Sequence, residues 1–146
     1  MFQIRLATVA DVPTLTSLVE QYRAFYKQDA NPNTESYLTE RIKNNESIVF
    51  VADDHGTLVG FTQCYPTFST VSLSEIWLLN DLFVVPEHRG KHIADQLMNT
   101  AEAHAKESGA TRIWLRTAHT NSPAQALYEG RGWLQDEVYR RYDLIF

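Results

Sequence analysis

Residues 79–98 join an apolar run to a helical repeat through a short polar loop. The run is rich in branched and aromatic residues and ends at Pro86, which cannot donate a hydrogen bond to a strand ladder. Beyond the loop, apolar residues recur at helical spacing until Gly109 supplies a helix stop. These apolar residues are Ile93, Leu97, Ala101 and Ala105. The segment therefore predicts a buried strand, a tight turn and an amphipathic helix, which is typical of an α/β fold.

The polar loop Glu87–Lys91 lies just before the first turn of this predicted helix. The N–H groups of a first helical turn have no partner within the helix and carry the positive end of its dipole. Arg89 and Lys91 add positive charge, and Gly90 lets a ligand approach the backbone closely. The loop therefore predicts an anion site, and a phosphorylated ligand is its natural occupant.

The rest of the chain predicts a single domain over residues 1–146, without a linker, repeat or low-complexity segment. Period-two alternation predicts strands, and 3.6-residue periodicity predicts helices. The predicted strands are 2–7, 47–52, 57–65, 75–85 and 112–117, and further helices are predicted at 12–27, at 34–44 and from Asn121 or Ser122 to Gly132. Residues 66–74 read as a turn. We expect strand 112–117 to lie parallel to strand 75–85 through a right-handed crossover.

Charge and composition exclude several classes of protein. The net charge is −5 and basic residues form no stripe beyond the pair Arg140-Arg141, which argues against a nucleic-acid partner. The chain has no run of 18 apolar residues and no charged-then-apolar leader, so we expect no membrane partner, no secretion signal and a cytoplasmic location. The single Cys64 has no disulfide partner. Because neither it nor the histidines show ligand spacing, no metal is expected.

Two segments resemble motifs of the GCN5-related N-acetyltransferase (GNAT) superfamily. Motif A, Gln/Arg-x-x-Gly-x-Gly/Ala, falls on Arg89–Ala94, with His92 where the family usually has glycine. A β-carbon is tolerated there if the residue is already helical, and the imidazole could reach a phosphate. Motif B reads Asn-x-x-Ala-x-x-Leu-Tyr-Glu-x-x-Gly-Phe/Trp and is matched by Asn121, Ala124, Leu127, Tyr128, Glu129, Gly132 and Trp133. The motifs follow the family's order and spacing, and the resemblance covers nearly the whole chain.

The resemblance implies the GNAT, or acyl-CoA N-acyltransferase, fold: a mixed, mostly antiparallel sheet splayed at two central parallel strands, with helices on both faces. It also implies that acetyl-coenzyme A is the cosubstrate and passes its acetyl group directly to an amine, without a covalent enzyme intermediate. The residues that the resemblance assigns to this cosubstrate are Leu82, Phe83, Val84, Arg89, Gly90, Lys91, His92, Ile93, Ala94, Asp95, Asn121, Ala124 and Tyr128.

Acetyl transfer to an amine needs a proton acceptor and a proton donor. An amine with a pKa near 10.4 is almost entirely protonated at pH 7, and its neutral form lies roughly 4–5 kcal/mol higher. Tyr128 matches the family tyrosine that protonates the departing thiolate. Asn80 stands where relatives often have a glutamate, and an amide cannot accept a proton. We expect deprotonation through water with Asp81 or Asn80 orienting the amine, while relays through Glu75 or Tyr65 stay open; regular alternation puts Asp81 on the opposite strand face from Asn80.

A finer resemblance is to the branch of diamine and yeast histone and amino-acid acetyltransferases. It depends on Thr67-Phe68-Ser69, on residues 79–84 and on Tyr139, Tyr142 and Leu144. It implies a homodimer, two closing strands at 133–137 and 138–145, and an acceptor such as a polyamine, an amino acid or a lysine side chain. The candidate substrate-binding residues are Tyr22, Tyr26, Tyr65 and Asp81.

Two other functions compete with an acetyltransferase. The first is a coenzyme A-binding regulatory or structural module, in which Asn80 and His92 reflect lost catalysis. The second is a general nucleotide-phosphate binder, which is disfavoured because the chain has neither a Walker-type loop nor metal-binding carboxylates.

Overall fold

The computed structural model describes residues 2–146, which form two compact units. The first unit extends to Leu115 and the second is Arg116–Phe146. Of the described elements, the first unit contains every strand and three of the four α-helices, and the second unit contains the remaining helix.

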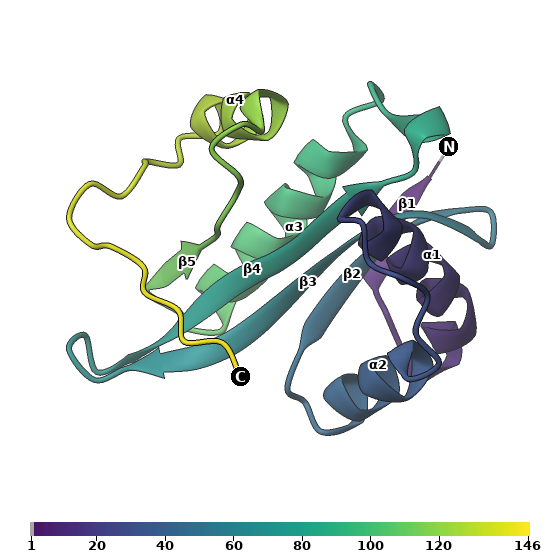
Figure 1. The fold of residues 1–146 in the computed structure, drawn as a ribbon, viewed down its shortest axis with the longest axis horizontal. Coiled ribbons are helices and arrows are strands. Elements are labelled where there is room, and N and C mark those ends of the chain that lie inside the picture. The colour runs from purple at the N-terminus through teal and green to yellow at the C-terminus, as the bar shows by residue number, and fades with distance from the viewer. Residues whose placement is uncertain (1) are drawn as a thin grey trace. The chain divides into compact units, whose positions relative to one another are not determined.

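The strands of the first unit form one mixed sheet in the order β1-β2-β3-β4-β5 (Figure 1). The strands are β1 (Gln3–Leu6), β2 (Ile48–Asp54), β3 (Thr57–Ser69), β4 (Ser74–Val84) and β5 (Arg112–Trp114). The pairs β1/β2, β2/β3 and β3/β4 are antiparallel, and β4/β5 is parallel. The predicted mixed, mostly antiparallel α/β sheet is confirmed. Within residues 2–146, however, the parallel pair lies at the edge of the sheet rather than at its centre.

Helices cover both faces of this sheet. The helices of the first unit are α1 (Val12–Phe25), α2 (Thr34–Lys43) and α3 (Ile93–Glu107), with short 3-10 turns at Val9–Asp11 and Pro86–His88. Val49 and Val51 of β2 pack in one core cluster with Leu15 of α1 and Leu38 of α2. Phe50, between those two valines, lies with its ring 4.7 Å from that of His104 of α3. Alternate residues of one strand thus face opposite helices, as the period of two requires.

The hairpin β3/β4 is longer than its sequence predicts. Residues 66–69 continue β3, with Pro66 opposite Trp77 and Ser69 opposite Ser74. The turn therefore occupies only residues 70–73, where Leu73 adopts a φ of 52°. Polar residues and a proline are typical of a turn, but cross-strand pairing with the apolar start of β4 keeps this segment extended.

The two closing strands predicted at 133–137 and 138–145 are absent from the described residues, where the chain from Trp133 to Phe146 is irregular. Its apolar side chains are exposed, with Leu134 at 93%, Tyr142 at 86% and Ile145 at 89%. A strand is stable only when its N–H and C=O groups pair with a neighbour, and no strand within residues 116–146 offers that pairing. The strand predicted at 112–117 is likewise shortened to β5.

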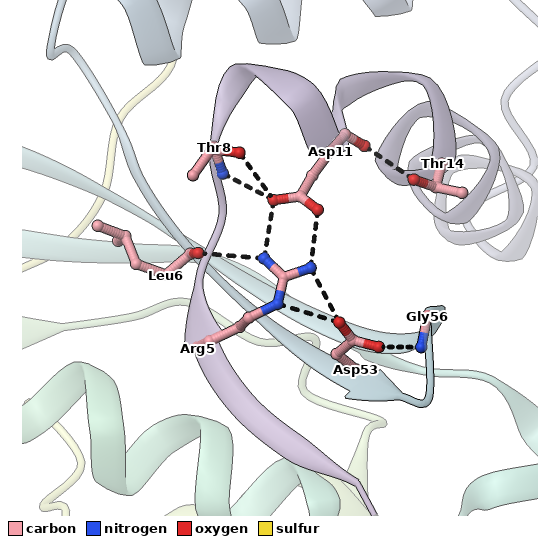
Figure 2. A network of polar contacts seen from close by, with 7 residues as sticks. All are labelled: Arg5, Leu6, Thr8, Asp11, Thr14, Asp53 and Gly56. Carbon is pink, nitrogen blue, oxygen red and sulfur yellow. Dashed lines mark hydrogen bonds and ion pairs between the residues drawn. The ribbon is translucent and has the colours of Figure 1, made fainter.

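Arg5 of β1 ties the start of α1 to the β2–β3 turn (Figure 2). Its guanidinium donates to both carboxylate oxygens of Asp11, at 2.8 and 2.9 Å, and its Nε donates to Asp53 Oδ2 at 3.0 Å. Asp11 also accepts from the Thr8 backbone N–H at 2.8 Å, and Asp53 accepts from the Gly56 N–H at 2.6 Å. The hydrogen bond from Arg5 is the largest reason why the pKa of Asp11 falls from 3.8 to about 2. Thr8 and Asp11 form a capping box at this entry to the helix.

Replacing Arg5 with Met should lower the free energy of unfolding by roughly 1–3 kcal/mol at pH 7, because two neighbouring carboxylates lose their shared cation at a partly exposed site. The lowered pKa of Asp11 stabilises the folded state above its unfolded value of 3.8, and this contribution is lost as the pH falls towards about 2. Urea denaturation of both proteins should show the difference shrinking over that pH range. The exposed Arg112 provides the matched control, Arg112→Met, and a pH-independent difference for Arg5→Met would contradict this explanation.

Candidate functional site

A β-bulge in β4 brings two neighbouring polar side chains to one cavity. Gln63 of β3 pairs with Asp81 and Cys64 pairs with Leu79, so Asn80 is the extra residue between them. A bulge interrupts the strict alternation of side chains on the bulged strand. As a result, Asn80 and Asp81 both line the same cavity. The prediction that Asp81 points to the opposite face is wrong because it assumed a regular strand.

The cavity lies in the first unit and has a volume of about 380 Å³. Val19 of α1, Leu38 of α2 and Phe61 of β3 form apolar parts of its wall. Polar groups of Asn80 and Asp81 join them from β4. A concave, mainly apolar space with a few convergent polar groups is the usual form of a small-molecule site.

The Asp81 carboxylate is held by neutral hydrogen-bond donors. Its Oδ2 accepts from Gln63 Nε2 at 3.0 Å, and its Oδ1 accepts from Asn80 Nδ2 at 3.0 Å. Burial raises the pKa of Asp81 above its ordinary value, and hydrogen bonds from Gln63, Asn80 and Tyr22 oppose that rise only in part. Such a carboxylate gains from a nearby cation and is well suited to accept a proton.

Of the three tyrosines predicted to bind substrate, Tyr22 and Tyr65 line the cavity. The Tyr65 hydroxyl lies 2.8 Å from that of Tyr37, a wall residue that the sequence did not single out. Burial raises the pKa of both Tyr22 and Tyr65. Tyr26 does not line the cavity: its side chain is 52% exposed and its ring packs edge-on against Tyr22 at 5.1 Å. Tyr26 is the C-cap of α1 and has a non-helical backbone conformation, so it lies just beyond the last residue of the helix.

Two other residues of the cavity wall escaped the sequence analysis, Gln63 and Arg23. Gln63 is only 4% exposed, in a strand whose neighbouring residues are mostly apolar. A single amide side chain inside a predicted buried strand indicates a candidate site residue, because buried polar groups need hydrogen-bond partners. Arg23 carried no such signal, since a charged residue on an amphipathic helix is ordinarily solvated.

The turn between β4 and α3 has the backbone that its motif requires. Gly90 has a φ of 76° and His92 a φ of 61°, both in the left-handed region. A β-carbon was expected to be tolerated at His92 because the residue would already be right-handed helical. That expectation is wrong: His92 has the left-handed conformation that glycine favours. No side chain caps the N-terminus of α3, so the first-turn N–H groups are not satisfied by a cap. Lys91 is exposed beside them.

Arg89 contacts the end of β4 rather than extending only into solvent. Its Nε donates to the Val84 carbonyl at 3.0 Å, and its guanidinium carbon lies 5.7 Å from the centre of the Phe83 ring. Arg89 thus stabilises the turn through its contacts with β4. Its contact with a phosphate stays a prediction. Parallel pairing of β4 with β5 covers only Ile76–Leu78, so the strand from Leu79 onward, including Leu82–Val84, lies beyond that pairing.

In the second unit, α4 (Ser122–Gly130) carries the central part of motif B, from Ala124 to Glu129. Asn121 caps it by accepting from the Ala124 backbone N–H at 3.3 Å, which confirms the predicted cap. The ring of Tyr128 lies 6.1 Å from that of Trp133, tilted by 40°. Tyr128 therefore has a defined packing environment within this unit.

Other kinds of site find no support in the part of the chain that the structure describes. In residues 2–146 no three His, Cys, Asp or Glu side chains are arranged to hold a metal ion. No described helix combines the length and apolar character needed to cross a bilayer. Burial raises the pKa of the Cys64 thiol to about 12, so this cysteine is a poor nucleophile at neutral pH.

Comparison with known proteins gives consistent matches over most of the chain. Residues 15–133 match the model of the Acetyltransferase (GNAT) family. The chain is 41% identical over 142 residues to YhfO, an uncharacterized N-acetyltransferase of Bacillus subtilis, which covers 97% of this chain and 95% of that protein. It is 28% identical over 136 residues to a probable acetyltransferase of Haemophilus influenzae, covering 92% and 91% of the two chains.

Solved structures share the fold. The crystal structure of a probable acetyltransferase has a TM-score of 0.92 and 35% identity, covering 99% of this chain and 97% of the other. A predicted acetyltransferase of Clostridium acetobutylicum, solved with acetyl-CoA, has a TM-score of 0.80 and 16% identity, covering 98% and 96% of the two chains.

Proposed function

Because the chain belongs to the GNAT family of acetyltransferases, we propose that it transfers the acetyl group of acetyl-coenzyme A directly to the primary amine of a small molecule bound at Asp81. By family membership the protein is an N-acetyltransferase. The observation that carries the proposal for the acceptor is a buried carboxylate in a cavity of about 380 Å³, on the strand that leads into the anion-binding turn.

The turn between β4 and α3 suits the diphosphate of the cosubstrate. Gly90 and His92 are in the left-handed region, and no side chain caps the start of α3. This backbone conformation favours an arrangement in which several N–H groups point towards one bound anion. Arg89 and Lys91 add positive charge. The backbone of Leu82–Val84, beyond the pairing with β5, supplies donors that would polarise the thioester carbonyl.

The proposed reaction begins with an ammonium ion whose charge is balanced by Asp81. The amine loses a proton to Asp81, directly or through one water, while Asn80 and Gln63 hold the carboxylate in place. The nitrogen then attacks the thioester carbonyl carbon and releases a second proton, the carbon–sulfur bond breaks, and the thiolate takes a proton. Following the motif B resemblance, we assign that proton to the Tyr128 hydroxyl. Holding both reactants in one site also makes the step effectively unimolecular.

Several finer features of the protein belong to the same proposal. The family model covers residues 15–133 and so includes parts of both units, which supports one acetyltransferase domain over residues 1–146. The branch resemblance suggests a homodimer and an acceptor among polyamines, amino acids and lysine side chains. The net charge of −5 supports the absence of a nucleic-acid partner, and the single cysteine agrees with a cytoplasmic location. Light scattering on the purified protein would measure the oligomeric state.

An amine panel tests the proposed function directly. Thiol release from acetyl-coenzyme A should rise above background with at least one polyamine, amino acid, simple amine or lysine peptide. Calorimetry should detect binding of acetyl-coenzyme A in the absence of any amine. Binding without turnover across the whole panel would favour the alternative, a coenzyme A-binding module, and a lack of binding would refute both functions.

Replacing His92 with Gly should raise the free energy of unfolding by roughly 0.5–1 kcal/mol, because glycine adopts the left-handed conformation at less cost, offset in part by its greater unfolded-state entropy. Urea denaturation of wild type, His92→Gly and His92→Ala measures this effect. His92→Ala keeps the β-carbon and should show no such gain. Equal changes in the two variants would mean that the imidazole, rather than the backbone conformation, determines stability at this position.

A further inference from the structure

The cavity at Asp81 contains a second buried acceptor that the reaction above does not use. Gln63 is 4% exposed, and its Nε2 donates to Asp81 Oδ2 at 3.0 Å. An ionised carboxylate only accepts, so this contact fixes which end of the amide faces Asp81. The other end, Oε1, is buried and has no hydrogen-bond partner among the described residues. Gln63 lines the cavity, so a ligand N–H that reached this oxygen would recover the free energy lost by leaving it unpaired.

Two charged side chains among the described residues line the cavity, Arg23 and Asp81, and of these Arg23 is paired with an opposite charge. Arg23 is the cation of the described wall, and its Nη1 donates to Glu20 at 3.0 Å and to the Asp29 carbonyl at 2.8 Å. Glu20 also accepts from the Thr34 hydroxyl at 2.6 Å, so it is fully engaged. Asp81, by contrast, is bonded by neutral amides and a phenol. The wall thus presents one uncompensated negative charge.

We propose that the acceptor is a small primary amine with a single positive charge and an uncharged, mainly apolar body. This inference rests on the proposed function and favours simple amines over the polyamines and amino acids that the branch resemblance suggests. The ammonium group donates one N–H to Asp81 and another to Gln63 Oε1, and only a primary amine still has an N–H for Gln63 after its nitrogen has become part of an amide. Phe61, Val19 and Leu38 contact the body.

The same charges disfavour the other acceptor classes. A second ammonium, as in a polyamine, finds Arg23 in the wall and no carboxylate that is free to pair with it. A carboxylate, as in an amino acid, meets the negative charge of Asp81, while Arg23 is already paired with Glu20. In the reaction, the ammonium loses one proton to Asp81 and one further N–H proton as the amide forms. Tyr128 protonates the thiolate, one of these two protons restores the Tyr128 hydroxyl, and the other goes to solvent.

Two matched pairs of amines test this selection. Pentylamine and 1,5-diaminopentane differ by the second ammonium, and 2-phenylethylamine and phenylalanine differ by the carboxylate. In each pair we expect kcat/KM to be at least about tenfold higher for the monoamine, the size expected when one charge lacks a partner. A ratio of one or less in either pair overturns the inference while leaving the acetyltransferase intact. If no amine is turned over, the proposed function fails, and calorimetry of the four amines still decides: the monoamines must bind more tightly.

Gln63→Met removes the unpaired oxygen at similar side-chain length. The variant also removes the Nε2 donor to Asp81. We expect KM for the preferred monoamine to rise by about tenfold and kcat to fall by a smaller factor, since Gln63 positions the amine as well as the carboxylate. Gln21→Met, at an exposed position of α1, is the matched control and should leave both constants unchanged. An unchanged KM in folded Gln63→Met, as judged by its unfolding transition, removes Gln63 from the acceptor site.

Arg23→Met tests the charge argument without disturbing the buried amide. Its side chain is 27% exposed, and its loss leaves Glu20 without its cation. The ratio of kcat/KM for 1,5-diaminopentane to that for pentylamine should then rise by about tenfold, because a second ammonium gains a carboxylate. An unchanged ratio would contradict the proposed charge selection even if Gln63→Met behaves as expected.

Discussion

Asp81→Asn is expected to lower kcat for amine acetylation by about 10²–10⁴-fold, the usual contribution of a general base. Asparagine has the same shape and can still accept from one neighbouring amide, but it cannot take a proton. Steady-state rates with a saturating amine measure the loss. The exposed Asp29 offers the matched control, Asp29→Asn, which should keep wild-type kcat. More than a tenth of wild-type turnover in Asp81→Asn would remove Asp81 from proton transfer.

The pH profile separates a base from a merely structural carboxylate. Because burial raises the pKa of Asp81, wild-type kcat should fall with decreasing pH at a higher pH than that of an ordinary aspartate, 3.8. Asp81→Asn should lack this acidic limb. A raised folded-state pKa also means that ionising Asp81 reduces the free energy of unfolding as the pH rises above its unfolded value. Asp81→Asn removes this charge, so the variant should be no less stable than wild type at pH 7.

Tyr128→Phe is expected to lower kcat by about 10²-fold, because a thiolate with a pKa near 8.5 then leaves without its proton donor. Acetyl-coenzyme A should bind with a Kd within about threefold of wild type, since only a hydroxyl is removed. Rapid kinetics and calorimetry measure the two quantities separately. Tyr139→Phe, at a tyrosine 78% exposed, is the control within the same unit. Equal losses of turnover and affinity would indicate that Tyr128 acts only by packing near Trp133.

Local spacing in the sequence was enough to predict the elements that frame the site. The apolar repeat of Ile93 and Leu97 and the stop at Gly109 predicted α3, whose buried residues include both. The helix predicted to begin at Asn121 or Ser122 is α4, which Asn121 caps. These features depend on contacts within one or two helical turns, which neighbouring residues determine. The motifs added the fold family, and the family match over residues 15–133 agrees with them.

The cavity at Asp81 depended on tertiary structure. Pairing between β3 and β4 creates the bulge that turns Asn80 and Asp81 towards one cavity, and it sets the amide of Gln63 against Asp81. Gln63 and Asp81 lie 18 positions apart in the sequence. No local sequence pattern encodes where the ladder between β3 and β4 takes an extra residue. The same dependence on pairing explains the error at the C-terminus, where strand-like residues lack a partner strand within their own unit. The sequence by itself thus determined the helices, the turn before α3 and the family, whereas pairing between distant strands decided which side chains line the cavity.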